Sequence, residues 1–364
     1  MTRWPNIRDS SSTGICCKRA TRLPAALFAV GVLWLAAGCA GRLGARRDAP
    51  GFTPGERVLL DAHNAYPERG RFVDRIGLAL ATGLPVAIEQ DIFWGRDAST
   101  GRQVPVVAHD SDATAGAPTL EHYFFDAIRP AMERALEENH REQWPLVVLN
   151  LDFKTNERDL HDAVLALLHR HDAWLTTAER TATPGVAAPL AAGPLLVLSG
   201  QDSTQRIDFH DRIPIGQRLA VFGAIVVPAP AGATRDQRAV SQVRARAEEL
   251  IPTRVSNYAR WVNFPWSVVE EGGAPRAGDW TTEDADRLDA LVARAHALGL
   301  WIRFYTLDGY DPARDEGLTT SYNFGSEAAV RARWRAAIRA RVDFIATDHY
   351  ARFHAEQVQL THRP

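Results

Sequence analysis

Cysteine is almost absent from this chain of 364 residues. Its three cysteines, Cys16, Cys17 and Cys39, all lie near the N-terminus. The residues after Cys39 therefore cannot form a disulfide among themselves. A domain built from these residues must be stabilised by its core alone. The roughly 320 residues that follow Cys39 are enough to bury such a core.

An excess of charge is also missing. The formal net charge is −2 at pH 7, so the balance indicates neither nucleic acid nor an anionic membrane as a partner. The sequence contains no internal repeat, and no Gly-rich phosphate-binding fingerprint follows its first predicted strand. The hydrophobic fraction of 46% and the charged fraction of 24% are those of an ordinary globular protein.

The apolar run over 25–37 is too short to span a bilayer comfortably. It follows a basic segment and ends in two alanines and a glycine before Cys39, which is the order of an export signal. This ending resembles a bacterial lipobox, which implies cleavage before Cys39 and lipidation of its thiol. An ordinary cleaved signal peptide and an uncleaved anchor are the alternatives.

From these features we expect a signal peptide over 1–38 and a tether over 39–55 that is rich in Gly, Arg, Ala and Pro. One folded domain is expected over 56–355, followed by a C-terminal tail over 356–364. The expected location is the bacterial cell envelope, at the outer membrane or the periplasmic face, with the protein attached to a membrane through Cys39. We expect a monomer.

Strand-like and helix-like segments alternate from residue 58 onward. Strands are predicted over 58–63, 86–93, 104–109, 146–153, 195–199, 223–227, 254–264, 301–307 and 344–347, and helices over 71–81, 120–139, 157–169, 282–298 and 326–339. Apolar strands that alternate with amphipathic helices indicate a parallel sheet covered by helices. About eight such units favour an α/β fold of the (β/α)8 TIM-type barrel class over a doubly wound open sheet.

Polar residues follow several of the predicted strands, where a parallel barrel gathers its functional groups. His63 ends the first strand, Glu89 and Asp91 lie in the second, and Asp152 ends a later one. Because side chains alternate along a strand, Glu89 and Asp91 share a face. Three carboxylates that converge repel one another unless a cation lies among them, and hard oxygen ligands suit Mg²⁺ or Ca²⁺.

Zinc would call for several His or Cys ligands. The only His-x-His, His169 to His171, ends a predicted helix and indicates solvated surface. His63 and His109 remain at strand ends, and a pair of imidazoles beside a divalent cation suits acid–base attack on a phosphodiester. Each residue also has a structural interpretation, such as an ion pair, so the argument depends on their order along the strands.

That ordered set resembles the superfamily of phospholipase C-like phosphodiesterases. The superfamily includes glycerophosphodiester phosphodiesterases, phosphatidylinositol-specific phospholipases C and sphingomyelinase D enzymes, and its shared fold is a TIM-type barrel. The ending over 342–348 (VDFIATD) is similar to the "G-V-D-x-I-x-T-D" close of the glycerophosphodiesterases. The resemblance runs from about residue 58 to residue 350.

The resemblance implies a role for each matching position. The catalytic pair is then His63 and His109, and the phosphate contacts are Lys154, Arg303 and Tyr305. The metal ligands are Glu89, Asp91 and Asp152, with Asn64 as a further candidate. The implied activity is metal-dependent hydrolysis of a phosphoric diester, either a glycerophosphodiester or a phospholipid head group, with one Mg²⁺ or Ca²⁺.

Departures from the family pattern leave the substrate open. Asn64 and Ala65 follow His63 where the glycerophosphodiesterases have Arg and Gly, and Tyr305 stands where a tryptophan is common. One alternative is a different metal-dependent hydrolase on the same barrel. The other is a non-catalytic lipoprotein that binds a phosphorylated head group or a glycan.

Overall fold

The computed structural model describes residues 53–67, 73–309 and 322–361, which all belong to one compact unit. The expected signal peptide, the lipobox with Cys39 and most of the expected tether lie outside these residues. Across the described ranges, no helix is both long and apolar enough to cross a membrane.

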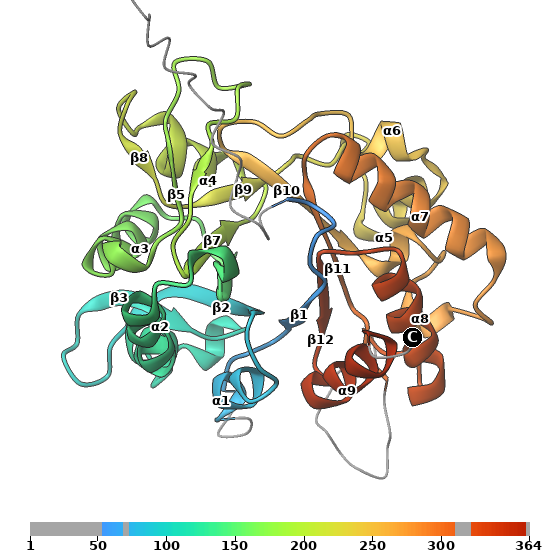
Figure 1. The fold of residues 1–364 in the computed structure, drawn as a ribbon, viewed down its shortest axis with the longest axis horizontal. Coiled ribbons are helices and arrows are strands. Elements are labelled where there is room, and N and C mark those ends of the chain that lie inside the picture. Colours follow the sequence, from blue (N-terminus) through green and yellow to red (C-terminus); the bar gives the residue numbers. More distant parts are fainter. Residues whose placement is uncertain (1–52, 68–72, 310–321, 362–364) are drawn as a thin grey trace, which may run out of the picture. The chain divides into compact units, whose positions relative to one another are not determined.

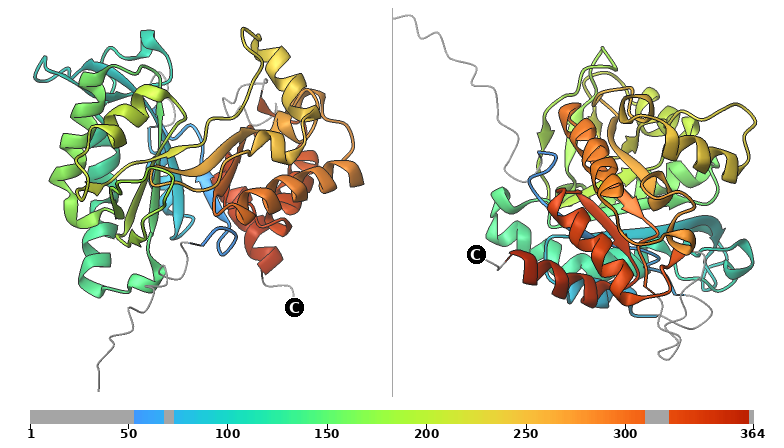
Figure 2. Two further views of the ribbon diagram at one scale, coloured as in Figure 1. Left: turned by 90° about the horizontal axis from the view of Figure 1, so that it is seen from above. Right: turned by 90° about the vertical axis from the view of Figure 1, so that its right-hand side faces the viewer.

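Eight parallel strands close into a barrel, as predicted (Figure 1). Neighbours around the ring follow the order β1-β12-β11-β10-β9-β7-β4-β2, and β2 pairs back to β1. The ring strands are β1 (Leu59–Ala62), β2 (Val86–Arg96), β4 (Val147–Phe153), β7 (Leu195–Ser199), β9 (Phe222–Ala224), β10 (Ala259–Pro265), β11 (Trp301–Tyr305) and β12 (Phe344–Thr347). Both views in Figure 2 place the first strand, in blue, beside the last, in red, in agreement with the register Leu59 to Phe344.

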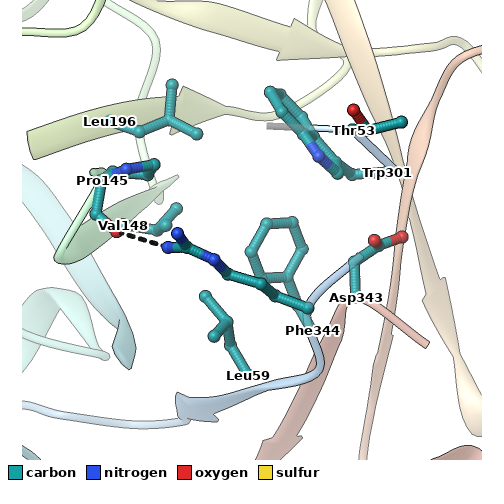
Figure 3. Close-up of a pocket in the computed structure, with 9 residues that line it drawn as sticks. Thr53, Leu59, Pro145, Val148, Leu196, Trp301, Asp343 and Phe344 are labelled. Carbon is teal, nitrogen blue, oxygen red and sulfur yellow. Dashed lines mark hydrogen bonds between the residues drawn. The ribbon is translucent and has the colours of Figure 1, made fainter. Parts of the chain in front are cut away.

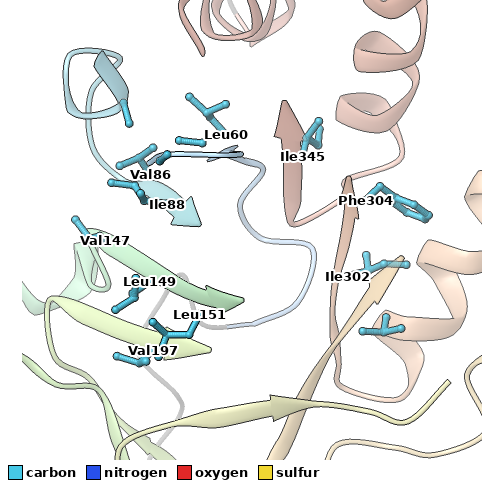
Figure 4. Packing of buried hydrophobic residues seen from close by; sticks show 14 of the residues in the cluster. Leu60, Val86, Ile88, Val147, Leu149, Leu151, Val197, Ile302, Phe304 and Ile345 are labelled. Atoms are coloured by element: carbon cyan, nitrogen blue, oxygen red, sulfur yellow. The ribbon is translucent and has the colours of Figure 1, made fainter. Parts of the chain in front are cut away.

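Helices cover the outside of this ring (Figure 1). They are α1 (Arg75–Leu80), α2 (Asp126–Glu138), α3 (Arg158–Arg170), α4 (Ser203–Arg206), α5 (Arg235–Arg244), α6 (Ala247–Leu250), α7 (Thr282–Ala297), α8 (Glu327–Arg339) and α9 (Tyr350–Thr361). Apolar side chains on the outer faces of the strands, such as Val86, Ile88 and Phe304, form one buried cluster with the helices (Figure 4). Strand alternation then turns the intervening residues, Ala87 and Glu89 among them, toward the barrel interior.

The barrel interior changes character along its axis. At the amino ends of the strands it is apolar, with Leu59, Val148 and Trp301 around a cavity of about 20 Å³ (Figure 3). A small antiparallel sheet of β5 (Thr177–Glu179), β6 (Leu190–Ala191) and β8 (Arg218–Leu219) contributes Ala178 and Leu219 to the same inner cluster. Polar side chains therefore collect at the opposite, carboxyl end, where barrel enzymes carry their chemistry.

One predicted strand is not part of the ring. β3 (Gln103–Val107) pairs antiparallel with the far end of β2, in the register Ile92 to Val107. β2 and β3 thus form a hairpin that extends beyond the barrel, and the chain returns from it to the rim at His109.

The expected C-terminal tail over 356–364 is wrong as far as residue 361, because α9 continues to Thr361. The side chain of Glu356 is only 1% exposed and pairs with two arginines of α8. Arg331 Nη1 lies 2.9 Å from Glu356 Oε2, and Arg335 Nε contacts Oε1. The tail prediction failed because a buried charged residue looks like a surface residue in a sequence.

Glu356→Ala should therefore destabilise the fold by about 3 kcal/mol, because it removes the shared carboxylate that pairs two arginines across α8 and α9. Urea unfolding at pH 7 measures the difference. The matched control is Glu137→Ala on the exposed face of α2, which should stay within about 0.5 kcal/mol. Equal losses for the two variants would contradict a structural role for α9.

Candidate active site

A pocket of about 250 Å³ opens at the carboxyl ends of the strands. Eight of the nine candidate residues from the sequence line it, namely His63, Asn64, Glu89, His109, Asp152, Lys154, Arg303 and Tyr305. The ninth, Asp91, is completely buried beside it. Other polar and aromatic residues complete the wall, including Asn150, Trp261, Asn263 and Tyr322.

Three carboxylates meet on the β2–β4 side of the pocket. Parallel pairing sets Asp91 opposite Asp152, and Glu89 lies two residues earlier on the same face of β2. One oxygen from each of the three lies within 4.8 Å of the others. Asp91 Oδ1 is buried and has no hydrogen-bond partner in the described part of the chain.

Two cations already contact these carboxylates. Lys154 Nζ lies 2.6 Å from Asp152 Oδ2 and 3.0 Å from Asp91 Oδ2. Arg303, which is 2% exposed, donates to Glu89 and Asp61 and, at 3.0 Å, to Asn263 Oδ1. With all groups ionised, these three carboxylates and Asp61 outnumber the two cations that contact them.

The pKa of Asp91 is consistent with this imbalance. Burial raises it first, and the charges of Asp152 and Glu89 raise it further, while Lys154 opposes them. The group formed by Glu89, Asp91 and Asp152 therefore fits one divalent cation, because its donors are hard oxygens and one buried oxygen lacks a hydrogen-bond partner among the described residues.

His63 lies in a second polar cluster, at the end of β1. Its Nδ1 is 3.0 Å from Asp348 Oδ1, and Arg75 Nη2 is 3.4 Å from the same oxygen. Burial lowers the pKa of His63, but the charge of Glu89 and the bond to Asp348 outweigh burial and raise it to about 10. Asp308 braces this cluster by accepting the backbone N–H of Asp348 at 2.6 Å.

Asn64 belongs to this second cluster and not to the three carboxylates. Its Nδ2 donates to both carboxylate oxygens of Asp348, at 3.1 and 3.2 Å, and its Oδ1 accepts the hydroxyl of Tyr66 at 2.9 Å. Its one side-chain oxygen thus already accepts a hydrogen bond and faces Tyr66. The expected ligand role of Asn64 finds no support in this arrangement.

His109 reaches the same pocket from the loop after β3. Its side chain is 43% exposed, and its Nδ1 lies 2.8 Å from Asp110 Oδ1. The imidazole stacks on the ring of Tyr66, with 5.7 Å between centroids. Tyr305 in turn stacks on His63 at 6.4 Å, and the guanidinium of Arg303 lies 5.3 Å from the Tyr305 ring.

Sequence reasoning missed three residues that shape the site. Asp348 ends the last strand in the quoted VDFIATD, so its position was a usable signal. Asp61 lies two residues before His63, and Asn150 lies two residues before Asp152. Because side chains alternate along a strand, each shares the inward face with its candidate. Asn150 is 5% exposed, lines the pocket, and has no side-chain hydrogen bond to any described residue, so its carboxamide is available to a polar ligand.

No family model and no curated protein matches this chain. Among solved structures, two glycerophosphodiester phosphodiesterases of Parabacteroides distasonis align at 14% and 13% identity, with TM-scores of 0.39 and 0.43. Both alignments cover 84% of this chain, and they cover 87% and 98% of those chains.

A calcium-dependent phosphoinositol-specific phospholipase C from a Pseudomonas species aligns at 15% identity and a TM-score of 0.42, over 82% of this chain and 91% of its own. An HPPK-DHPS of Plasmodium falciparum reaches 0.44 at 9% identity, over 85% of this chain and 48% of its own. Since every one of these TM-scores is below 0.5, the similarities carry no weight for the activity, which is argued from the site itself.

Proposed function

We propose that this protein is a metal-dependent phosphoric diester hydrolase that acts on a glycerophosphodiester or a phospholipid head group, with His63 and His109 as its acid–base pair. One observation supports this above all. A single pocket holds both histidines next to a group of three carboxylates that could hold a metal ion. Two imidazoles for proton transfer, together with positive charge beside the phosphoryl oxygens, suit the attack on a phosphodiester.

Glu89, Asp91 and Asp152 would hold Mg²⁺ or Ca²⁺, which stabilises negative charge on the phosphoryl oxygens when bound. Lys154 lies next to these carboxylates and adds positive charge on the pocket side. Arg303 is held mainly by Asp61 and Glu89, so its contribution to phosphate binding is the charge of a fixed group in the pocket wall.

Asp348 determines which nitrogen of His63 exchanges a proton with the substrate. The Nδ1–H of the imidazole donates to the carboxylate, so Nε2 is the atom that exchanges a proton with the substrate. Asp110 has the same relation to His109. One imidazole accepts the proton of the nucleophile and the other donates one to the leaving oxygen. The nucleophile is a neighbouring substrate hydroxyl, which yields a cyclic phosphate, or water, which yields the monoester, and product analysis distinguishes them.

Metal binding has a direct thermal signature. At 100 times its dissociation constant, Mg²⁺ or Ca²⁺ should stabilise chelator-treated protein by about 2.7 kcal/mol and raise Tm. Asp91→Asn should lose most of this increase, because it removes a central ligand. The exposed Asp279→Asn is the matched control and should keep it. Identical increases in both variants, or none in the unmodified protein, would rule out a cation among these carboxylates.

A second function is favoured by Asn150, whose unused carboxamide suits recognition of a hydroxylated group. On this alternative the protein is a lipoprotein that binds a phosphorylated head group or a glycan without turnover. An activity screen over glycerophosphodiesters, phosphatidylinositol, sphingomyelin and lysophospholipids separates the two, since a binder gives saturable calorimetric titration and no product.

We further propose that the protein is exported and attached to the bacterial cell envelope through lipidated Cys39. The support is the order of basic segment, short apolar run and small residues before that cysteine. Incorporation of labelled palmitate, and its loss in Cys39→Ser, is the corresponding test. Processing that is insensitive to globomycin would contradict the proposal.

A further inference from the structure

A continuous set of side-chain contacts joins the two histidines of the pocket. His63 contacts Asp348, Asp348 contacts Asn64, Asn64 contacts Tyr66, and the Tyr66 ring stacks on His109. We propose that Asn64 and Tyr66 are positioning residues that orient both histidines at once, and that neither of them binds the cation. This inference rests on the proposed function for its effect on catalysis, whereas the arrangement itself can be measured without turnover.

The Asn64 amide can take only one orientation in this set. Tyr66 O–H donates to Oδ1, so Nδ2 faces Asp348 and supplies hydrogens to its two carboxylate oxygens. His63 and Arg75 approach the same carboxylate from other directions. Asn64 therefore holds Asp348 in the rotation at which it accepts from His63 Nδ1.

The backbone places Asn64 and Tyr66 for this task. Asn64 has φ of 52°, a left-handed conformation that asparagine tolerates better than most residues. Its carbonyl accepts the backbone N–H of Tyr66 at 2.8 Å, which closes a tight turn. The turn directs the Asn64 side chain to the Asp348 carboxylate and brings the Tyr66 hydroxyl to Asn64 Oδ1, and Tyr66 is 7% exposed.

The other end of the set explains why His109 needs support. Its side chain is 43% exposed and contacts the neighbouring Asp110 and the Tyr66 ring. An exposed imidazole at the end of a hairpin can adopt several rotamers. The buried Tyr66 ring that stacks on it reduces the number of accessible rotamers. Since Tyr66 is itself held by Asn64, a substitution of Asn64 should change the orientation of both histidines.

Three variants separate the contacts. Asn64→Ala removes the bonds to Asp348 and Tyr66 and the 2.9 Å contact with His63 Nδ1. Tyr66→Phe removes only the hydroxyl bond, and Tyr66→Leu also removes the stacked ring. The first readout is the long-range ¹H–¹⁵N spectrum of the imidazoles, with signals assigned from single histidine substitutions. Asn64→Ala and Tyr66→Leu should both change the signals of His63 and His109, while exposed His122 should keep its signal.

The second readout is kinetic. Asn64→Ala should lower kcat about 10- to 100-fold with little change in KM, because misplaced catalytic groups cost rate more than ground-state binding. Tyr66→Phe should lose less than Tyr66→Leu, because it keeps the ring under His109. In all three variants the metal-induced rise in Tm should remain, since the cation site is untouched.

Unchanged imidazole signals in folded Asn64→Ala and Tyr66→Leu would overturn the inference. So would loss of the metal-induced Tm increase in Asn64→Ala, which would make Asn64 a ligand after all. If the unmodified protein hydrolyses no diester, the proposed function fails while the spectra still decide the positioning role. If it does hydrolyse one, an unchanged kcat in Asn64→Ala overturns the role and leaves the function standing.

Discussion

His63→Gln is expected to lower kcat for phosphodiester hydrolysis by about 100- to 10,000-fold, with KM changed little. Glutamine has a similar length and keeps a polar group toward Asp348, but it cannot exchange a proton at neutral pH. The residue is 5% exposed and lines the pocket together with His109, Lys154 and Asp152.

The measurement is steady-state kinetics on bis(p-nitrophenyl) phosphate with saturating Mg²⁺ or Ca²⁺. The matched control is His122→Gln, an exposed histidine outside the pocket whose imidazole bonds to Asp126, and it should retain full activity. His109→Gln should resemble His63→Gln, and the double variant should lose little more than either single one, because the two groups act as a unit. Activity that survives in His63→Gln would exclude acid–base catalysis by this residue and favour the binding alternative.

The barrel and the grouping of candidates followed from short-range rules. Alternation of apolar strands and amphipathic helices predicted the parallel barrel, and the two-residue period placed Glu89 and Asp91 on one face. Parallel pairing then brings Asp152 opposite Asp91, as the register shows. These features depend only on spacing along the chain, which is why a single sequence contains them.

Side-chain partners across the barrel could not be predicted from the sequence. Arg303 bonds to Asp61 and Glu89, which lie 242 and 214 residues away in the sequence, and Asp348 is 285 residues from His63. No local pattern indicates which inward-facing residues share a layer, because that depends on the stagger of the strands when the barrel closes. The sequence alone therefore suggested Arg303 as a phosphate contact, and only the structure shows the two carboxylates that hold it.

Asn64 illustrates a second limit. Its place after His63 suggested a ligand by analogy, but its side-chain direction depends on a left-handed backbone and on Tyr66 two residues later. The sequence likewise did not indicate that β3 pairs with β2 in a hairpin, because the β3 residues resemble those of a ring strand. Both features follow from local backbone geometry that apolar periodicity does not encode.

Arg303→Met is expected to destabilise the protein by about 3–5 kcal/mol at neutral pH in the presence of a chelator. The guanidinium is the shared partner of Asp61 and Glu89, which are 1% and 5% exposed. Methionine fills much of the same volume but leaves two carboxylates buried beside each other. Most of the loss is thus the cost of unpaired charge and not of a cavity.

The pH dependence of this loss has a definite sign. In the unmodified protein burial raises the pKa of Glu89, but Arg303, His63 and Lys154 outweigh it, so the folded-state pKa lies below the unfolded one. Such a group stabilises the fold above its unfolded pKa and loses that contribution as pH falls through the folded pKa. Without Arg303, burial and the charge of Asp61 dominate and the pKa rises instead. The penalty is then largest at high pH and shrinks as pH falls and the carboxylates take up protons.

Urea unfolding at pH 8 and pH 5 tests both the size and the sign of the effect. The difference between Arg303→Met and the unmodified protein should be clearly smaller at pH 5. Adding Asp61→Asn and Glu89→Gln to Arg303→Met should recover part of the loss, because the buried charges are then gone, whereas exposed Arg238→Met should stay within about 0.5 kcal/mol. A pH-independent loss below about 1 kcal/mol, which is typical of a surface pair, would mean that Arg303 does not hold these carboxylates. It would then be free to contact phosphate, as its sequence position first suggested.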